Sequence, residues 1–450
     1  MFRAKQWQPS AIKYDNSQQN EITANSVFIK CVIVAVYICQ MLLLFSRSTF
    51  ELVLGPVLAI CIIILMFTPY YYIPVAVVFL TTHALGTVIL GRISFFVLMG
   101  FMLVLRLFIV KFKNNFNLSD IAWMLLGLFN CFHLAVFMYD SIGSEKLTII
   151  VVFTLWMIYM RGDTRSKEEV FPNFWLAFAF AITTNAVVSL LSRSATMYET
   201  SDRMGIIGFG SNDPNIAAMV ITLGIAILLS SQKTKMWVRI TALIILFFSL
   251  ITTVSISGLI AATFTVLVFS IIMNKNKKNV SALLIILLGA LVAVYLFPML
   301  GIMGQKNAAG ETVNYLEYFQ EKLNDKMSNF AGSDIDNATS GRSELTRMNL
   351  EYLFEQSALK QLFGGNHVNP LGINVSHNSF VDIMLRYGYL GFFAVFLLMI
   401  YSVLRCMQRT KHTGDCTILL CKLLMIYWSL TLSLFDSNGA VLWFSLVLML

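Results

Sequence analysis

Two polar segments of this sequence hold the residue types and spacings that could do chemistry. The first contains Arg203 and, after a glycine-rich turn, Asp213, Pro214 and Asn215 in succession. Asp213 can cap a helix, Pro214 suits a first helical turn, and the free N–H groups at such a helix start can bind an anion. The alternative interpretation is a capped helix that follows a flexible loop.

The second polar segment holds Arg342, which follows a glycine, and His377, which is followed by Asn378. Arginine binds anions, and histidine can accept or release a proton near neutral pH. Taken alone, however, a histidine where a helix enters a membrane is usually an ordinary interfacial residue. Asp382 and Arg386 lie one helical turn apart below this segment, and we expect them to pair with each other or to support the residues above them.

The composition indicates that a membrane protein must position these residues. Of 450 residues, 58% are hydrophobic and 12% are charged, whereas about a quarter are charged in ordinary soluble proteins. This excludes a cytosolic or secreted enzyme and a disordered or fibrous chain. The net charge of +8 is interpreted as a sign of membrane topology, so no nucleic-acid partner is expected.

Long apolar runs predict an all-α polytopic membrane protein with about 14 transmembrane helices, in the range of about 12 to 14. The predicted helices cover residues 27–46, 51–67, 71–90, 93–110, 120–139, 147–160, 171–191, 213–231, 236–253, 256–273, 279–299, 379–404, 417–435 and 437–450. The last is short enough to be a partial span. The membrane part thus divides into a first block at 27–300, with eleven helices, and a last block at 377–450, with three.

The distribution of Lys and Arg predicts the orientation of these helices. With a cytoplasmic tail at 1–26, which shows no cleavable signal, most basic residues of the connections fall inside. The outer side then receives a loop at 192–212 and a large loop at 301–376. In the large loop, apolar spacing at 313–330 and 343–363 predicts two amphipathic helices on the outer membrane surface.

Other polar and sulfur-containing residues have simpler interpretations. Arg106 and Lys422 lie near predicted cytoplasmic helix ends, where their side chains could snorkel to water. All seven cysteines fall in predicted helices or on the predicted cytoplasmic side, so no outer disulfide is expected. Since CxxC, HExxH and Walker A patterns are missing from the sequence, neither a metal nor another cofactor is predicted.

In combination, these segments resemble the O-antigen polymerase and ligase superfamily of polytopic bacterial glycosyltransferases. The resemblance covers about residues 195–395. It rests on the order and common side of motifs that are individually weak: Arg203 before Asp213-Pro214-Asn215, Gly341-Arg342, Gly364-Gly365, His377-Asn378, and Gly388 with Gly391. Many relatives also have Ser-Arg where this chain reads Ser255-Ile256-Ser257-Gly258, so that arginine is missing here.

The resemblance implies transfer of a glycan from undecaprenyl diphosphate to a hydroxyl at the outer face of the bacterial cytoplasmic membrane, without metal. Arg342 and Arg203 would then stabilise the diphosphate leaving group, and His377 would be the base. Asp213, Asn215, Asn378, Asp382 and Arg386 would bind or support the substrate. The expected partners are the lipid-linked oligosaccharide and the bilayer, and a chain-length regulator protein is a further candidate.

The sequence leaves three functions open. The leading hypothesis is a polymerase that joins lipid-linked repeat units into O-antigen or capsule, and the second is a ligase that delivers the glycan to a lipid or protein. A flippase or other transporter of the lipid-linked unit belongs to a different class. Transporters tend to show internal repeats, and none is visible in this sequence.

Overall fold

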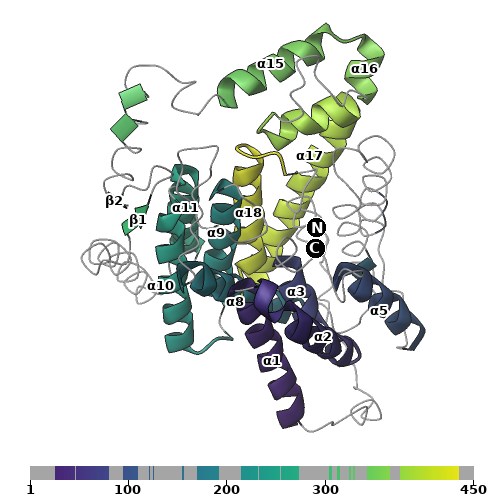
Figure 1. Ribbon diagram of the computed structural model, residues 1–450. Coiled ribbons are helices and arrows are strands. Elements are labelled where there is room, and N and C mark those ends of the chain that lie inside the picture. Colours follow the sequence, from purple (N-terminus) through teal and green to yellow (C-terminus); the bar gives the residue numbers. More distant parts are fainter. Residues whose placement is uncertain are drawn as a thin grey trace, which may run out of the picture.

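The chain is described by a computed structural model, which is almost entirely helical (Figure 1). It describes residues 26–45, 47–80, 95–109, 170–191, 214–231, 233–253, 255–272, 304–306, 312–314, 342–364 and 376–434, with isolated positions at 121, 125, 155–156, 324–325 and 328–329. Its principal helices are α1 (Ser26–Phe45), α2 (Arg47–Met66), α3 (Tyr72–Leu80), α5 (Phe95–Ile109), α8 (Phe171–Leu191), α9 (Pro214–Ser230), α10 (Met236–Thr252), α11 (Ile256–Ile272), α15 (Arg342–Glu355), α16 (Ala358–Phe363), α17 (Ser379–Thr413) and α18 (Thr417–Ser429).

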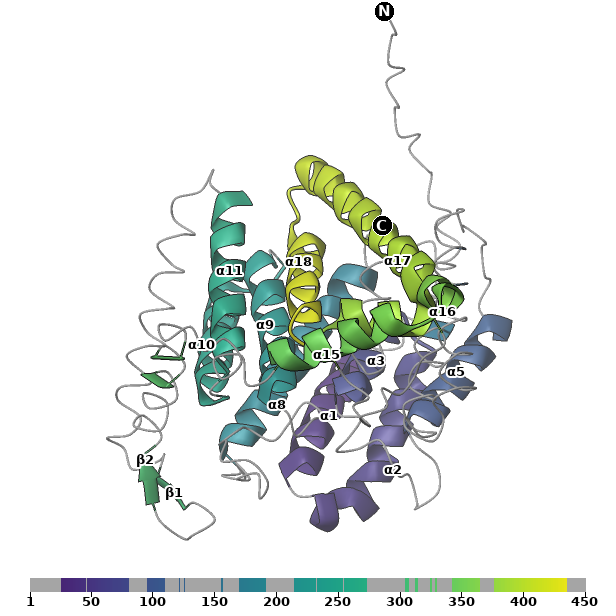
Figure 2. The same ribbon diagram turned by 90° about the horizontal axis from the view of Figure 1, so that it is seen from above.

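Helix α9 forms the centre of the bundle. It packs against α8, α10, α11 and α18, and both Figure 1 and Figure 2 show it between α11 and α18. Residues 217–229 of α9 are buried without exception. A helix that is apolar all round belongs in a core rather than on a surface, so the other helices assemble around α9.

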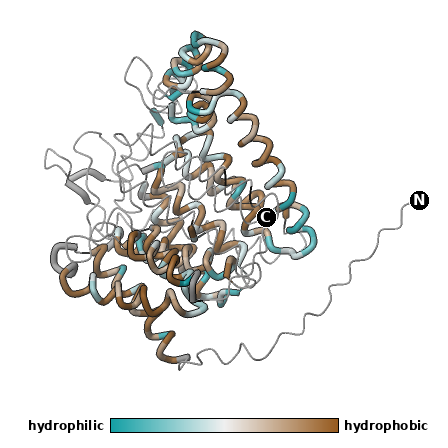
Figure 3. The backbone as a smooth tube through the Cα atoms, turned by 90° about the vertical axis from the view of Figure 1, so that its right-hand side faces the viewer, coloured by the Kyte–Doolittle hydropathy of each residue, from teal (hydrophilic) through white to brown (hydrophobic). Residues whose placement is uncertain are grey.

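Three described helices are long and apolar enough to cross a membrane. They are Val27–Phe45, Phe171–Ser189 and Ser379–Thr413. Other apolar helices in the described residues are shorter, with 10–17 residues, and hydrophobic residues dominate the packed helices (Figure 3). The predicted helical chain is thus confirmed, with three helices that could cross a membrane, while the count of about 14 spans stays a prediction. The predicted helices at 120–139, 147–160, 279–299 and 437–450 lie wholly or almost wholly outside the described residues.

The first predicted amphipathic helix begins differently from the expectation. The predicted range, 313–330, starts inside strand β2 (Thr312–Asn314), which pairs antiparallel with β1 (Gly304–Lys306). The β-branched pair Thr312-Val313 favours an extended backbone when a partner strand is close. The helix prediction is therefore wrong at its first residues, and the chain is not purely α-helical.

The second predicted amphipathic helix is two helices. The range 343–363 is interrupted after α15, because Ser357 is extended (φ −60°, ψ 150°) and forms the N-cap position of α16. Serine is less favourable than alanine inside a helix, because its hydroxyl offers the backbone other hydrogen bonds, but it is common at the N-cap position. The side-chain amide of Gln361 donates to the carbonyl oxygens of Phe354 (2.9 Å) and Gln356 (2.8 Å), which holds α16 at an angle to α15.

Helix α17 is kinked where α16 touches it. Gly388 has φ 67° and ψ −174° inside α17, and Gly364, which ends α16, has φ 77°. A Cβ atom on Gly364 would overlap the carbonyl of Arg386, and one on Gly388 would overlap the carbonyl of Leu362. The two backbones therefore meet directly, which only glycine permits at positive φ without strain.

Two buried cations correct the snorkelling prediction. Arg106 is 2% exposed and Lys422 is fully buried, so neither head group reaches water. The Arg106 guanidinium donates to the carbonyl oxygens of Met66 and Thr68 and lies 4.4 Å from the ring centroid of Tyr71. A cation suits these carbonyls because they lie at the negative end of α2. Lys422 Nζ donates to Ser402 Oγ at 2.6 Å and thereby ties α18 to α17.

We predict that alanine at the two touching glycines destabilises the protein far more than alanine at Gly414. All three have positive φ, but a Cβ on Gly414 meets open space. Gly414→Ala should therefore cost about 1 kcal/mol, and Gly364→Ala or Gly388→Ala roughly 3 kcal/mol or more. Thermal unfolding in detergent measures the difference. Equal losses for all three variants would show that the backbones do not meet.

Candidate functional site

The described candidate residues lie on helix ends that meet at one end of the bundle. Arg342 opens α15, Asn215 lies in the first turn of α9, and His377 and Asn378 immediately precede α17. Asp382, in the first turn of α17, and Arg386, one turn further on, belong to the same helix. Arg203 and Asp213 lie outside the described residues.

A short segment after α18, residues 430–434, holds two of these helix starts. Arg342 Nη1 donates to the carbonyl oxygen of Thr431 at 3.0 Å. Ser379, the first residue of α17, donates through Oγ to the carbonyl oxygen of Leu432 (2.6 Å) and accepts from the N–H of Leu434 (2.8 Å). The starts of α15 and α17 are thus bound to the same turn. The cation suits this position, because carbonyls at a helix C-terminus carry partial negative charge.

His377 has an unusual backbone. Among the described residues it is the single non-glycine residue with positive φ, at 55°. This conformation costs roughly 1–2 kcal/mol for an L-residue and concentrates at functional sites. The imidazole is half-buried, neither sealed in the core nor fully in water. The outlier therefore adds a physical reason to regard His377 as functional, which the sequence alone did not provide.

Hydrogen bonds on both sides of His377 hold this conformation. Asn378 Oδ1 accepts from the N–H groups of Phe380 (3.0 Å) and Val381 (3.4 Å), so it caps α17. Ser376 donates through its N–H to Asp382 Oδ1 (3.1 Å) and exchanges bonds with the backbone of Asn378 through its hydroxyl. The side-chain oxygen of Asn378 is thus occupied in capping, and Asp382 positions the chain beside His377.

Helix α15 brings Arg342 towards His377. Thr346 Oγ1 donates to the carbonyl oxygen of Ser376 at 3.2 Å, next to His377 in the chain. Arg342 and Thr346 are four residues apart, so they share one face of α15 about 6 Å apart along its axis. The backbone next to His377 therefore contacts the same face of α15 that carries Arg342.

The start of α11 joins the site through Ser255. Ser255 Oγ donates to Asn215 Oδ1 (2.9 Å) and accepts from the N–H of Gly258 (3.1 Å). Tyr427 of α18 donates its hydroxyl to the carbonyl oxygen of Ser257 (2.9 Å). The serine of this turn thus binds Asn215 and joins the start of α11 to the start of α9.

Asp382 and Arg386 are both buried, at 4% and 5% exposure. Their spacing of four residues places them on one face of α17, where opposite charges compensate each other. The Asp382 carboxylate, however, accepts a hydrogen bond from the N–H of Ser376. The structure therefore gives Asp382 a supporting position beside His377 rather than one defined by Arg386 alone.

Several residues that organise the site carry little or no signal in the sequence. Ser376, Ser379, Thr346 and Tyr427 all act through hydrogen bonds to backbone groups. Such bonds depend on which chain segment lies nearby and not on the type of the partner residue. The one usable signal is Ser379, because it directly follows the His377-Asn378 motif.

We predict that the backbone at position 377 tolerates asparagine but not valine. Asparagine enters the left-handed region readily, whereas a β-branched residue does so rarely. His377→Asn should keep the thermal stability of the parent chain, and His377→Val should lose about 1–2 kcal/mol. Thermal unfolding in detergent tests this expectation, and equal stability of the two variants would contradict the strained backbone.

Comparisons of the chain with protein-family models, with curated proteins and with solved structures find no match. The site is therefore defined by the contacts of its own residues. Within the described part of the chain, no group of three or more His, Cys, Asp or Glu residues could hold a metal ion. The chemistry open to the site is that of an arginine, a strained histidine and the helix starts around them.

Proposed function

We propose that the protein is a glycosyltransferase that joins undecaprenyl-diphosphate-linked oligosaccharide units into a surface polysaccharide. The reaction takes place at the outer face of the bacterial cytoplasmic membrane. The observation that carries the proposal is the meeting of Arg342 with the His377 segment, because the sequence separates these two by a stretch of polar chain and the turn after α18 draws them together.

In the proposed reaction, His377 accepts the proton of an acceptor hydroxyl on a second repeat unit. The hydroxyl oxygen attacks the anomeric carbon of the donor glycan, and the bond from that carbon to the diphosphate breaks. Undecaprenyl diphosphate leaves, and the displacement inverts the anomeric centre. A neutral imidazole that titrates at about pH 6.5 suits the base, since it releases the proton again near neutral pH.

Arg342 stabilises the leaving group. A guanidinium stays charged at every physiological pH and grips a phosphate through two parallel N–H donors. It carries five donors, so the bond to Thr431 and a grip on phosphate are compatible. The start of α17 adds partial positive charge close by. Arg203 and the helix start at Asp213 remain predicted as a second grip on the diphosphate.

The base is tested with His377→Asn, which is expected to fold because asparagine accepts the backbone at this position. In a strain that lacks the gene, the variant should leave single repeat units on the surface while long chains disappear. Gel analysis of surface glycan measures this. Long chains at the parent level would refute the base, and lipid-linked units that accumulate inside would identify a transporter instead.

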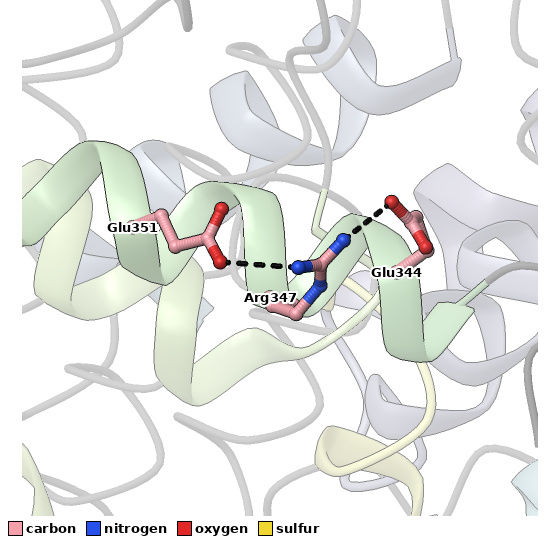
Figure 4. Close-up of polar contacts among 3 residues, drawn as sticks. All are labelled: Glu344, Arg347 and Glu351. Atoms are coloured by element: carbon pink, nitrogen blue, oxygen red, sulfur yellow. Dashed lines mark hydrogen bonds and ion pairs between the residues drawn. The ribbon is translucent and has the colours of Figure 1, made fainter.

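The diphosphate grip is tested with Arg342→Lys against Arg347→Lys. Arg347, on the same helix, is 62% exposed and pairs with Glu344 (2.8 Å) and Glu351 (3.3 Å) at the surface (Figure 4). Such exposed pairs contribute at most about 1 kcal/mol. Arg342→Lys should reduce polymer formation by roughly 100-fold, because a lysine ammonium lacks the planar pair of N–H donors that binds a phosphate at two oxygens. Arg347→Lys should leave polymer formation unchanged. Similar activity in both variants would exclude the bidentate role.

A further inference from the structure

The outward face of α16 is apolar. Leu359, Leu362 and Phe363 are 70%, 40% and 65% exposed. Their spacing of three and four residues places them on one side of this short helix, and we call them the α16 apolar face. Exposed large side chains that adjoin one another mark a contact surface.

Helix α17 presents a long apolar stripe to the outside of the bundle. Its members follow one another at helical spacing and are each 40–65% exposed: Leu390, Phe393, Leu397, Ile400, Leu404 and Met407. In a helix that is long and apolar enough to cross a membrane, such a stripe faces lipid, because water would not tolerate it. The stripe therefore marks the lipid-facing side of α17.

The two ends of this stripe give the depth of the bilayer. Leu390 and Met407 are separated by about 25 Å along the helix, which is close to the hydrocarbon thickness of about 30 Å. Three basic residues cluster around this end of the stripe, namely Arg405, Arg409 and Lys411, as expected at a membrane boundary. The other boundary therefore lies near Leu390.

Helix α16 lies at that second boundary. Gly388, two residues before Leu390, is in direct backbone contact with Leu362 and Phe363, and Figure 1 shows α16 descending from α15 to this part of α17. The α16 apolar face thus lies at the same level along α17 as the top of the lipid-facing stripe. Lys360 is exposed on the same helix and suits the head-group layer, where lysine commonly lies.

Helix α15 has the opposite character. Its outward face carries Glu344, Arg347 and Glu351, whose side chains are 44–62% exposed and joined by ion pairs (Figure 4). A charged face of this kind belongs in water. Phe354 follows on the same face and is 62% exposed. The polar surface therefore gives way to the apolar surface in the last turn of α15, just before the break at Ser357.

We infer that α16 is an interfacial anchor, whose apolar face lies in the boundary between head groups and acyl chains of the bilayer that α17 crosses. The sequence predicted two helices lying on the membrane surface, and the inferred lipid contact is made by α16 and not by the charged face of α15. The anchor fixes the height of the α17 start above the lipid, since the two helices touch through Gly364 and Gly388. This inference does not depend on the proposed function.

Tryptophan fluorescence of the full chain in liposomes tests the anchor. Phe363→Trp and Leu359→Trp are prepared separately, and Glu351→Trp on the charged face of α15 serves as the matched control. The emission of the parent chain, with seven native tryptophans, is subtracted. The quenchers are phosphatidylcholine brominated near the top of one acyl chain, which acts from the lipid, and iodide, which acts from water.

The anchor requires that brominated lipid reduces the added emission of Phe363→Trp and Leu359→Trp by about half, because an interfacial helix buries its apolar face about 5–10 Å into this layer. Iodide should have little effect on them and should quench Glu351→Trp. Equal iodide quenching of all three variants would place α16 in water and overturn the inference. If both quenchers failed to reach the added tryptophans, and dilution of the protein with lipid removed this protection, a second copy of the chain would cover the α16 apolar face. That result would also overturn the inference.

Discussion

The direct contact of two backbones at Gly364 and Gly388 is the constraint on which the candidate site depends. It closes the distance between the end of α16 and the kink in α17, and a single methyl group on either residue would overlap a carbonyl of the other helix. Because α15 leads into α16 through the short break at Ser357, the same contact helps to determine where α15 lies over the start of α17. The position of Arg342 relative to His377 therefore depends on the absence of two side chains some distance from both residues, together with the turn after α18 that binds both helix starts.

The glycine motifs of this chain can be understood in the same way. In the sequence, Gly364 and Gly388 belong to a pattern that resembles a family of glycosyltransferases, and nothing in that pattern distinguishes a catalytic turn from a packing contact. The structure gives these two positions a packing reason, since their positive φ and their close approach both exclude larger residues. His377 is the contrasting case, because it keeps a positive φ without being glycine. A strained residue held by its neighbours is a typical feature of a functional site.

The sequence predicted the helices well where a single strong signal determined them. Apolar length located α8 and α11 to within one residue, and it placed the start of α17 at Ser379 correctly. Prediction failed where tertiary contacts decided the outcome. Arg106 and Lys422 were expected in water, but carbonyl and hydroxyl oxygens of other helices bind them in the interior. Hydropathy cannot anticipate such partners, because it evaluates each residue against solvent and not against a specific neighbour.

The turn after α18 also has a consequence for the order of folding. Its bonds to Ser379 and Arg342 join residues 53 and 89 positions apart, and α18 itself bonds to Ser257 and Thr222 across 170 and 206 positions. Every one of these partners precedes α18 in the chain. Contacts of such high sequence separation form slowly, because the loop-closure entropy must be overcome first. As the chain enters the membrane, the helices that carry Asn215, Arg342 and His377 are made before the element that binds them together. The site is thus assembled only after α18 has joined the bundle, so a partly synthesised chain carries these residues without their common anchor.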